Sequence, residues 1–267
     1  MKCKKKVSII MGIYNCADTL EEAIESILKQ TYEDWELIMC DDGSQDDTYE
    51  IAMQFSKQYE NICTFQNEKN MGLNYTLNKC LKKANGEYIA RMDGDDISLP
   101  TRLEKEVAFL DSHKEYAIVS TNMIYFDGQG EWGESNMLAF PEKVDLIKGT
   151  PFCHAPCMVR KEAYEKVKGY SVEKKLLRVE DYHLWFKMYS AGYKGHNLQE
   201  ALYKMRDDRN AIQRRKFKYR INEAYVKRLI MKNFGLPIKN IVYVVRPIIV
   251  GVMPTFLYEY LHKKKMK

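Results

Sequence analysis

The chain has 267 residues, of which 45% are hydrophobic and 30% charged, an ordinary globular composition that excludes a disordered chain, a collagen and a polytopic membrane protein. Lys and Arg number 42 against 37 Asp and Glu, and the resulting net charge of +5 is too small to indicate nucleic-acid binding. The seven cysteines include no CxxC pair, and several lie within apolar runs, which favours a reducing compartment and a cytoplasmic protein.

Short apolar runs alternate with helical patterns through the first part of the chain. The run from Val7 to Ile13 precedes a helical pattern from Leu20 to Leu28, and no small-residue cleavage site follows it, so we interpret it as a buried strand rather than a signal peptide. Further runs lie at Trp35 to Cys40, Ile62 to Phe65 and Tyr88 to Ala90. This alternation predicts an α/β fold with a mostly parallel, Rossmann-like sheet and helices on both faces.

Polar residues follow these strands, namely Tyr14-Asn15, Asp41-Asp42-Gly43, Asn70 and Asp93-Gly94-Asp95-Asp96. In open sheets of this kind, ligands bind beyond the carboxyl ends of the strands. We therefore expect these groups to converge on one crevice.

The stretch Asp93-Gly94-Asp95-Asp96 is strongly acidic, and its carboxylates would repel one another without a counter-charge. Carboxylates suit a hard cation such as Mg2+ or Mn2+, which takes substrate phosphate oxygens as further ligands. The stretch therefore predicts a metal bound together with a diphosphate. The alternative is a solvated acidic turn on the surface.

A second acidic strand end, Asp41-Asp42-Gly43-Ser44, is compatible with a tight turn before a helix and also with a binding site. A buried carboxylate at a strand tip can accept the imide N–H of uracil, and Gly43 lets the chain turn close to a ligand.

The alternation stops after about residue 115. The segment from Tyr116 to Phe126 is rich in β-forming residues, and helices are predicted from Lys161 to Val167 and from Glu180 onward. We assign this second half of the chain to the binding of a second substrate, the acceptor.

The order of these motifs, with Glu180-Asp181 as the last, resembles that of the family 2 inverting glycosyltransferases over about residues 5–205. The resemblance implies the GT-A fold and an enzyme of bacterial surface-polysaccharide synthesis that uses a nucleotide sugar, usually a UDP-sugar, with Mg2+ or Mn2+. It divides the chain into a nucleotide-sugar-binding half (1–115), an acceptor-binding half of the same domain (116–207) and a helical C-terminal extension (208–267).

The resemblance also implies residue roles on the donor side. Tyr14 would pack on the uracil and Asp42 would accept its N3–H, while Asn70 and Gly72 would line the nucleotide loop. Gly12, where the family commonly has Pro or Thr, and Asn15 belong to the same loop region.

On the phosphate side, Asp93 would lie near the ribose and the metal waters, and Asp95 would be the direct metal ligand. Family members often carry a His late in the domain that contributes to the metal or the diphosphate. This chain has Arg206 in that stretch, and a guanidinium can pair with phosphate in a bidentate manner.

Inverting transfer needs a carboxylate on the acceptor side to take the hydroxyl proton, and a separate site to stabilise the departing diphosphate. The resemblance makes Asp181 the catalytic base, with Glu180 and His154 on the acceptor side. The alternatives are that Glu180 and Asp181 merely favour the N-terminus of a helix, and that His154 is structural.

The C-terminal region is basic and then apolar. Residues 204–232 hold eleven Lys or Arg against three acidic residues, and Arg246 and Glu259 are the charges between Ile241 and Leu261. Pro247 and Pro254 interrupt this run. The pattern of residues 204–267 therefore predicts a helix that lies in the membrane interface, with the basic stretch held by anionic lipids, rather than a membrane span. Packing against the catalytic domain or a homodimer partner is the alternative, and no interleaved aromatics indicate nucleic acid.

We therefore expect a metal-dependent hexosyl- or N-acetylhexosaminyltransferase that acts on a glycan acceptor, for example a lipid-linked one, at the inner face of the cell membrane. A non-catalytic nucleotide-sugar-binding protein is the first alternative. A sugar-phosphate nucleotidyltransferase is disfavoured, because Gly12-Ile13-Tyr14-Asn15-Cys16 is neither glycine-rich nor basic.

Overall fold

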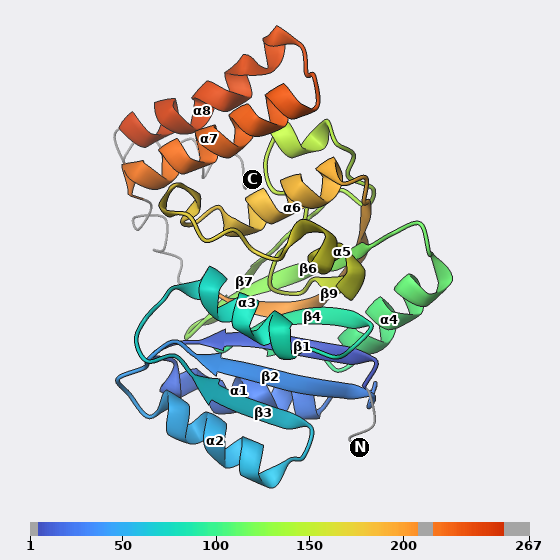
Figure 1. Ribbon diagram of the computed structural model, residues 1–267, viewed down its shortest axis with the longest axis vertical. Helices are drawn as coiled ribbons and strands as arrows, with labels where there is room; N and C mark the ends of the chain where they lie inside the picture. Colours follow the sequence, from blue (N-terminus) through green and yellow to red (C-terminus); the bar gives the residue numbers. More distant parts are fainter. Residues whose placement is uncertain (1–4, 208–215, 254–267) are drawn as a thin grey trace.

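In the computed structural model, which describes residues 5–207 and 216–253, the strands of the described chain form one nine-stranded sheet (Figure 1). The strand order is β3-β2-β1-β4-β8-β6-β9-β5, and β7 pairs with β6. The strands are β1 (Val7–Ile13), β2 (Trp35–Asp41), β3 (Ile62–Gln66), β4 (Tyr88–Asp93), β5 (Ile97–Ser98), β6 (Ile118–Asp127), β7 (Gly130–Glu134), β8 (Met158–Arg160) and β9 (Gly195–Arg206). The helices are α1 (Ala17–Leu28), α2 (Thr48–Gln58), α3 (Leu73–Lys83), α4 (Arg102–Ser112), α5 (Lys161–Val167), α6 (Glu180–Ser190), α7 (Phe217–Asn233) and α8 (Ile241–Val252), with 3-10 turns η1 (Asp145–Ile147), η2 (Lys174–Leu176) and η4 (Ile238–Asn240).

The first four strands of the chain form the parallel part of the sheet that the alternating pattern predicts. Because successive side chains of a strand point to opposite faces, Ile9 and Leu37 join the core under α1 and α4, while Ile10 and Ile38 join the core under α3, α5 and α6. Both faces of β1, β2 and β4 are thus buried, which explains their largely apolar sequences, whereas the edge strand β3 is partly exposed.

The second half of the chain continues the same sheet in mixed orientation. Strand β8 is antiparallel to both β4 and β6, and β6 is parallel to β9. At its far end β9 pairs with β5, so that Ile97 lies opposite Lys204. This pairing brings Arg206, the last residue of β9, next to the acidic turn that follows β4.

Helices α7 and α8 form an antiparallel pair at one end of the molecule, with α7 packed on α6, η1 and η2 (Figure 1). The helix expected from Ile241 to Leu261 is observed as α8 up to Val252. Residues 208–215 and 254–267 of the expected C-terminal extension lie outside the described residues. No helix in the described ranges has the length and apolar character needed to cross a bilayer.

Gly86 fixes the distance between the α3–β4 connection and β1. Its amide N–H donates to Ser8 Oγ at 2.8 Å, and a Cβ added to Gly86 would lie 2.6 Å from the backbone nitrogen of Ser8. Since the obstruction is backbone, a rotamer change cannot relieve it. The position of β4, and of the acidic turn at its end, therefore depends on this glycine.

We expect Gly86→Ala to lower the free energy of unfolding by about 2 kcal/mol, because the added methyl overpacks the contact with β1. Gly128→Ala is the matched control, since a Cβ there meets nothing within 4 Å, and it should change stability by less than about 0.5 kcal/mol. Urea denaturation of both variants measures the difference. If the two variants were equally stable, β1 would be able to move away from the added methyl group at little cost in free energy, and the prediction would be wrong.

Candidate active site

A cavity of about 340 Å³ lies at the carboxyl ends of β1 and β4. Its lining comes from the β1–α1 loop with the start of α1, Asp46 of the β2–α2 loop, the acidic turn after β4 and the end of β9. Four segments far apart in sequence therefore meet at the edge of the sheet where a ligand is expected. Six of the candidate donor-side and metal residues line it: Gly12, Tyr14, Asn15, Asp93, Asp95 and Arg206.

The β1–α1 loop is tied to the turn that follows β2. Asn15, at a φ of 48°, donates its backbone N–H to Ser44 Oγ and accepts the N–H of Gln45 on its side-chain oxygen, both at 2.9 Å. Tyr14, the preceding residue, remains 44% exposed. An aromatic ring held at the mouth of a cavity by a fixed loop offers a flat apolar surface to a planar ligand.

Asp42 and the loop that carries Asn70 and Gly72 lie outside the cavity lining. The Asp42 side chain is buried and accepts the N–H groups of Met71 and Gly72, both at 2.8 Å, and the side-chain amide of Asn67 at 2.7 Å. This carboxylate therefore holds the loop against the end of β2. Asn67 is a further residue of this site that was not predicted, although it is a polar residue directly after β3.

Three carboxylates meet in the acidic turn after β4, where oxygens of Asp93, Asp95 and Asp96 lie within 4.8 Å of one another. The Nη2 of buried Arg91 donates to Asp93 at 2.6 Å. The hydroxyl of Tyr203 accepts the N–H of Asp93 at 3.2 Å and hydrogen-bonds to Asp96. Asp96 was not among the candidate site residues, although the acidic stretch itself contained the signal.

The negative charges of the acidic turn repel one another. Burial and the charges of Asp93 and Asp95 raise the pKa of Asp96 to about 8, and burial and the charge of Asp93 raise the pKa of Asp95. Convergent carboxylate oxygens are the donors that Mg2+ and Mn2+ prefer. The residues present thus fit such an ion.

Arg206 lies on the β9 side of the cavity. Its backbone N–H donates to Asp96 at 2.8 Å, and its side chain donates to the carbonyl oxygen of Asp95 at 3.0 Å and to Glu22 at 2.6 Å. Its guanidinium lies 4.5 Å from the ring centre of Phe126. The guanidinium is thus held beside the acidic turn, where it can reach an anionic ligand in the cavity.

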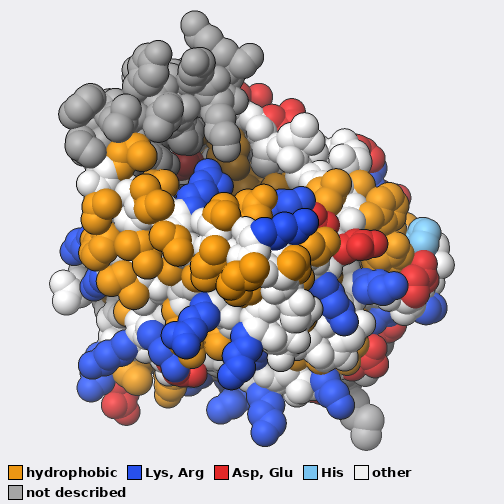
Figure 2. Space-filling view, turned by 90° about the horizontal axis from the view of Figure 1, so that it is seen from above, with side chains coloured by type: hydrophobic (Ala, Val, Ile, Leu, Met, Phe, Trp, Pro, Cys, Tyr) orange, Lys and Arg blue, Asp and Glu red, His pale blue; other side chains and the backbone are white. Residues whose placement is uncertain are grey.

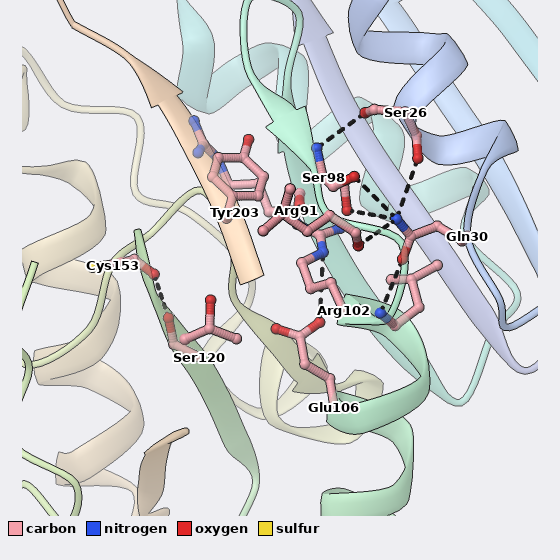
Figure 3. Close-up of polar contacts among 12 residues, drawn as sticks. Ser26, Gln30, Arg91, Ser98, Arg102, Glu106, Ser120, Cys153 and Tyr203 are labelled. Carbon is pink, nitrogen blue, oxygen red and sulfur yellow. Dashed lines mark hydrogen bonds and ion pairs between the residues drawn. The ribbon is translucent and has the colours of Figure 1, made fainter. Parts of the chain in front are cut away.

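A buried polar network supports the acidic turn from behind (Figure 3). Arg102 is fully buried, donates to the carbonyl oxygen of Arg91 at 3.1 Å and lies over the ring of Tyr203 at 5.2 Å. The Glu106 carboxylate, also fully buried, lies 3.8 Å from Arg102 Nε. Gln30 joins the start of α4 to α1, because its side chain accepts the N–H of Leu103 at 3.1 Å and donates to the carbonyl oxygen of Ser26 at 3.2 Å.

Glu180 and Asp181 open α6, as expected. Burial and the charge of Asp181 raise the pKa of Glu180. His154 makes a 2.8 Å hydrogen bond to the Tyr170 hydroxyl through Nε2, and burial together with the charge of Arg91 holds the pKa of His154 well below its usual value. The charge of Arg91 therefore acts on both His154 and the acidic turn, and the charge of Asp181 also raises the pKa of Tyr170. His154 lies beside α6, because its ring centre is 5.8 Å from that of Trp185.

The fold and the site together define the class of GT-A glycosyltransferases. Residues 8–168 match the model of glycosyl transferase family 2, and the chain belongs to this family. The family and the fold predicted from the order of motifs are thus confirmed, and the protein is a glycosyltransferase.

Relatives match over most of the chain. The Bacillus subtilis protein EpsE, which is named as a glycosyltransferase, is 46% identical over 267 residues, with 100% of this chain and 96% of EpsE covered. The Escherichia coli UDP-Glc:alpha-D-GlcNAc-diphosphoundecaprenol beta-1,3-glucosyltransferase WfaP is 30% identical over 230 residues, covering 86% of this chain and 87% of WfaP. The crystal structure of S. aureus TarS 1–349 in complex with UDP-GlcNAc shares the fold, with a TM-score of 0.70, 21% identity, and coverage of 91% of this chain and 70% of TarS 1–349.

Because Glu106 is buried, its ionisation should make the stability of the protein depend on pH. Burial raises the pKa of Glu106 from 4.5 to about 8, so between these two pH values the folded protein holds a proton that the unfolded chain has lost. The contribution of Glu106 to the free energy of unfolding must then fall as the pH rises from about 4.5 to about 8. Gln mimics the protonated acid, so Glu106→Gln should match the parent protein near pH 4 and exceed its stability by more than about 1 kcal/mol at pH 8.5.

Chemical denaturation at both pH values measures this difference. Glu104→Gln, an exposed position on the same helix, is the control and should keep the parent's pH dependence. A Glu106→Gln variant that declined with pH as steeply as the parent would contradict the assignment.

Proposed function

We propose that the enzyme transfers a hexosyl or N-acetylhexosaminyl group from a UDP-sugar, with inversion, to a hydroxyl of a lipid-linked glycan in surface-polysaccharide synthesis. The observation that carries this proposal is the three-carboxylate turn, whose Asp93 and Asp95 line the same cavity as the exposed ring of Tyr14. The printed names of relatives support the substrates, since WfaP uses UDP-Glc and a diphosphoundecaprenol acceptor and the TarS neighbour binds UDP-GlcNAc. A lipid-linked acceptor places the enzyme at the inner face of the cell membrane, as a peripheral protein.

On the donor side, Tyr14 packs on the uracil and Asp42 accepts its N3–H. Asp42 Oδ2 accepts the Gly72 N–H, and a carboxylate oxygen has a second lone pair for the uracil. Gly12 and Asn15 line the nucleotide side of the cavity, and Asn70 lies on the loop that Asp42 holds.

On the diphosphate side, Asp93, Asp95 and Asp96 would hold Mg2+ or Mn2+. The bound ion would supply positive charge to offset the charge that develops on the departing diphosphate. Arg206 donates hydrogen bonds to the oxygens of the diphosphate, because its guanidinium is held beside the acidic turn by Glu22 and by the carbonyl oxygen of Asp95.

On the acceptor side, Asp181 takes the proton of the acceptor hydroxyl as that oxygen bonds to the anomeric carbon. The bond from the anomeric carbon to the diphosphate breaks on the opposite face, which inverts the configuration. Glu180, which precedes the base in α6, and His154, which is neutral at physiological pH and packs against Trp185 of the same helix, orient the acceptor.

Asp95→Ala should abolish the metal-dependent part of UDP binding, because the most exposed carboxylate of the turn is removed. Titration calorimetry with UDP in the presence and absence of Mn2+ measures this loss. Asp18→Ala, which removes a carboxylate that lines the same cavity outside the turn, is the control. Unchanged UDP affinity of Asp95→Ala in Mn2+ would rule out the metal assignment.

Asp181→Asn should lower turnover by about 10²- to 10⁴-fold, the usual contribution of a positioned general base. Affinity for the UDP-sugar should change less than about threefold, because Asp181 lies outside the donor cavity. Transfer rates and UDP-sugar affinity measured on one preparation decide the role, with Glu173→Gln, an exposed position shortly before α6, as the control. Retained turnover would move the base to Glu180 or His154, and a loss of donor binding would make Asp181 structural.

A further inference from the structure

The solvent-facing side of α8 carries a continuous apolar stripe. Val242 is 57% exposed, Ile249 55% and Val252 68%. The stripe also includes Ile241, Val245 and Ile248, so its members recur at the spacing of one helix face. The opposite side of α8 is packed into the protein through Tyr243, Val244 and the buried Pro247.

The stripe continues beyond α8 onto its neighbours. Phe217 and Ile221 of α7 are 43% and 49% exposed, and Ile238 of η4 is 77% exposed. Phe217 lies beside Gly251, so the two helices present their apolar residues together. We call these nine residues of α7, η4 and α8 the docking surface. Figure 2, which looks down on this end, shows hydrophobic side chains gathered across it with Lys and Arg among and around them.

The charge around the docking surface has one sign. Residues 216–253 contain eight Lys or Arg and one acidic residue, Glu223. Glu223 is engaged by Arg220 at 3.5 Å and by Lys227 at 3.3 Å. The exposed basic residues of this region are Lys216, Lys218, Arg228, Lys232, Lys239 and Arg246.

We propose that this surface docks the enzyme on an anionic lipid bilayer. The apolar stripe lies below the headgroups, and the basic residues contact lipid phosphates. Exposed apolar side chains that are gathered in one patch with a polar rim mark an interaction site. A second copy of the chain fits less well, because a two-fold interface would set one basic margin against the other.

The position of the docking surface suits the proposed acceptor. Helix α7 packs on the segment that leads into α6, where Asn222 donates to the carbonyl oxygen of Leu177 at 2.9 Å. Val172 and Leu177 of that segment are themselves 57% and 46% exposed. In this respect the inference rests on the proposed function, since a glycan anchored in the bilayer would approach Glu180 and Asp181 from the docked side.

Flotation of the full chain with vesicles tests the apolar stripe. The protein should bind vesicles of phosphatidylcholine with phosphatidylglycerol and should bind phosphatidylcholine alone much more weakly, with the difference removed by high salt. The double variant Val245→Ser/Ile249→Ser should lower the partition coefficient at least tenfold. Leu138→Ser, at a position 57% exposed outside the docking surface, is the control and should bind as the parent.

A second pair of variants tests the charge. Lys239→Gln should weaken binding to the anionic vesicles about fivefold, the contribution of one basic residue near a charged bilayer. Lys57→Gln on α2, also exposed but remote from α8 in Figure 1, should have no effect. UDP binding of every variant confirms that the fold is retained.

Two results would overturn the inference. The first is vesicle binding that the stripe variant leaves unchanged. The second is a dimer in sedimentation velocity that the same variant dissociates, which would give the surface to a second copy of the chain.

Transfer assays separate this inference from the proposed function. The stripe variant should keep the parent's turnover on a water-soluble acceptor analogue and lose it on an acceptor embedded in vesicles. A parent protein that binds vesicles but transfers to neither acceptor would instead overturn the proposed function.

Discussion

Mutual repulsion among the carboxylates of Asp93, Asp95 and Asp96 is the constraint around which this edge of the sheet is organised. Arg91 neutralises one of them from the buried side, and the hydroxyl of Tyr203 links the backbone of Asp93 to the side chain of Asp96. The protein itself therefore neutralises part of the negative charge of these carboxylates, and the remaining negative charge faces the cavity.

The positive charges behind the acidic turn must themselves be stabilised, because the side chains of Arg91 and Arg102 are almost completely buried. Arg102 is stabilised by the ring of Tyr203 and by the carbonyl oxygen of Arg91, and Glu106 lies close without making an ideal ion pair. Burying such groups costs several kcal/mol unless they are paired. Strand β9, which supplies Tyr203, and helix α4, which supplies Arg102, are thus coupled to the geometry of the acidic turn.

The parallel part of the fold could be predicted from the sequence, because strands covered on both faces are unbroken apolar runs that alternate with amphipathic helices. The mixed part could not, since β8 has three residues and β6 pairs with a strand whose first residue, Gly195, is distant in sequence. In the site, residue types at strand ends identified Asp93 and Asp95, which the structure brings together with Asp96. The bonds of Asp42 to the amides of Met71 and Gly72 depend on the path of a loop, which residue types do not specify.

The single sheet also limits how this enzyme can diversify. Since β8 and β6 hydrogen-bond onward from β4, and β9 returns to β5 beside the acidic turn, the first and second parts of the described chain are joined by backbone pairing. They cannot be exchanged between enzymes as separate modules without leaving strand edges unpaired. New specificities are therefore acquired by changes in the loops at the edge of the sheet, while the shared framework is inherited whole.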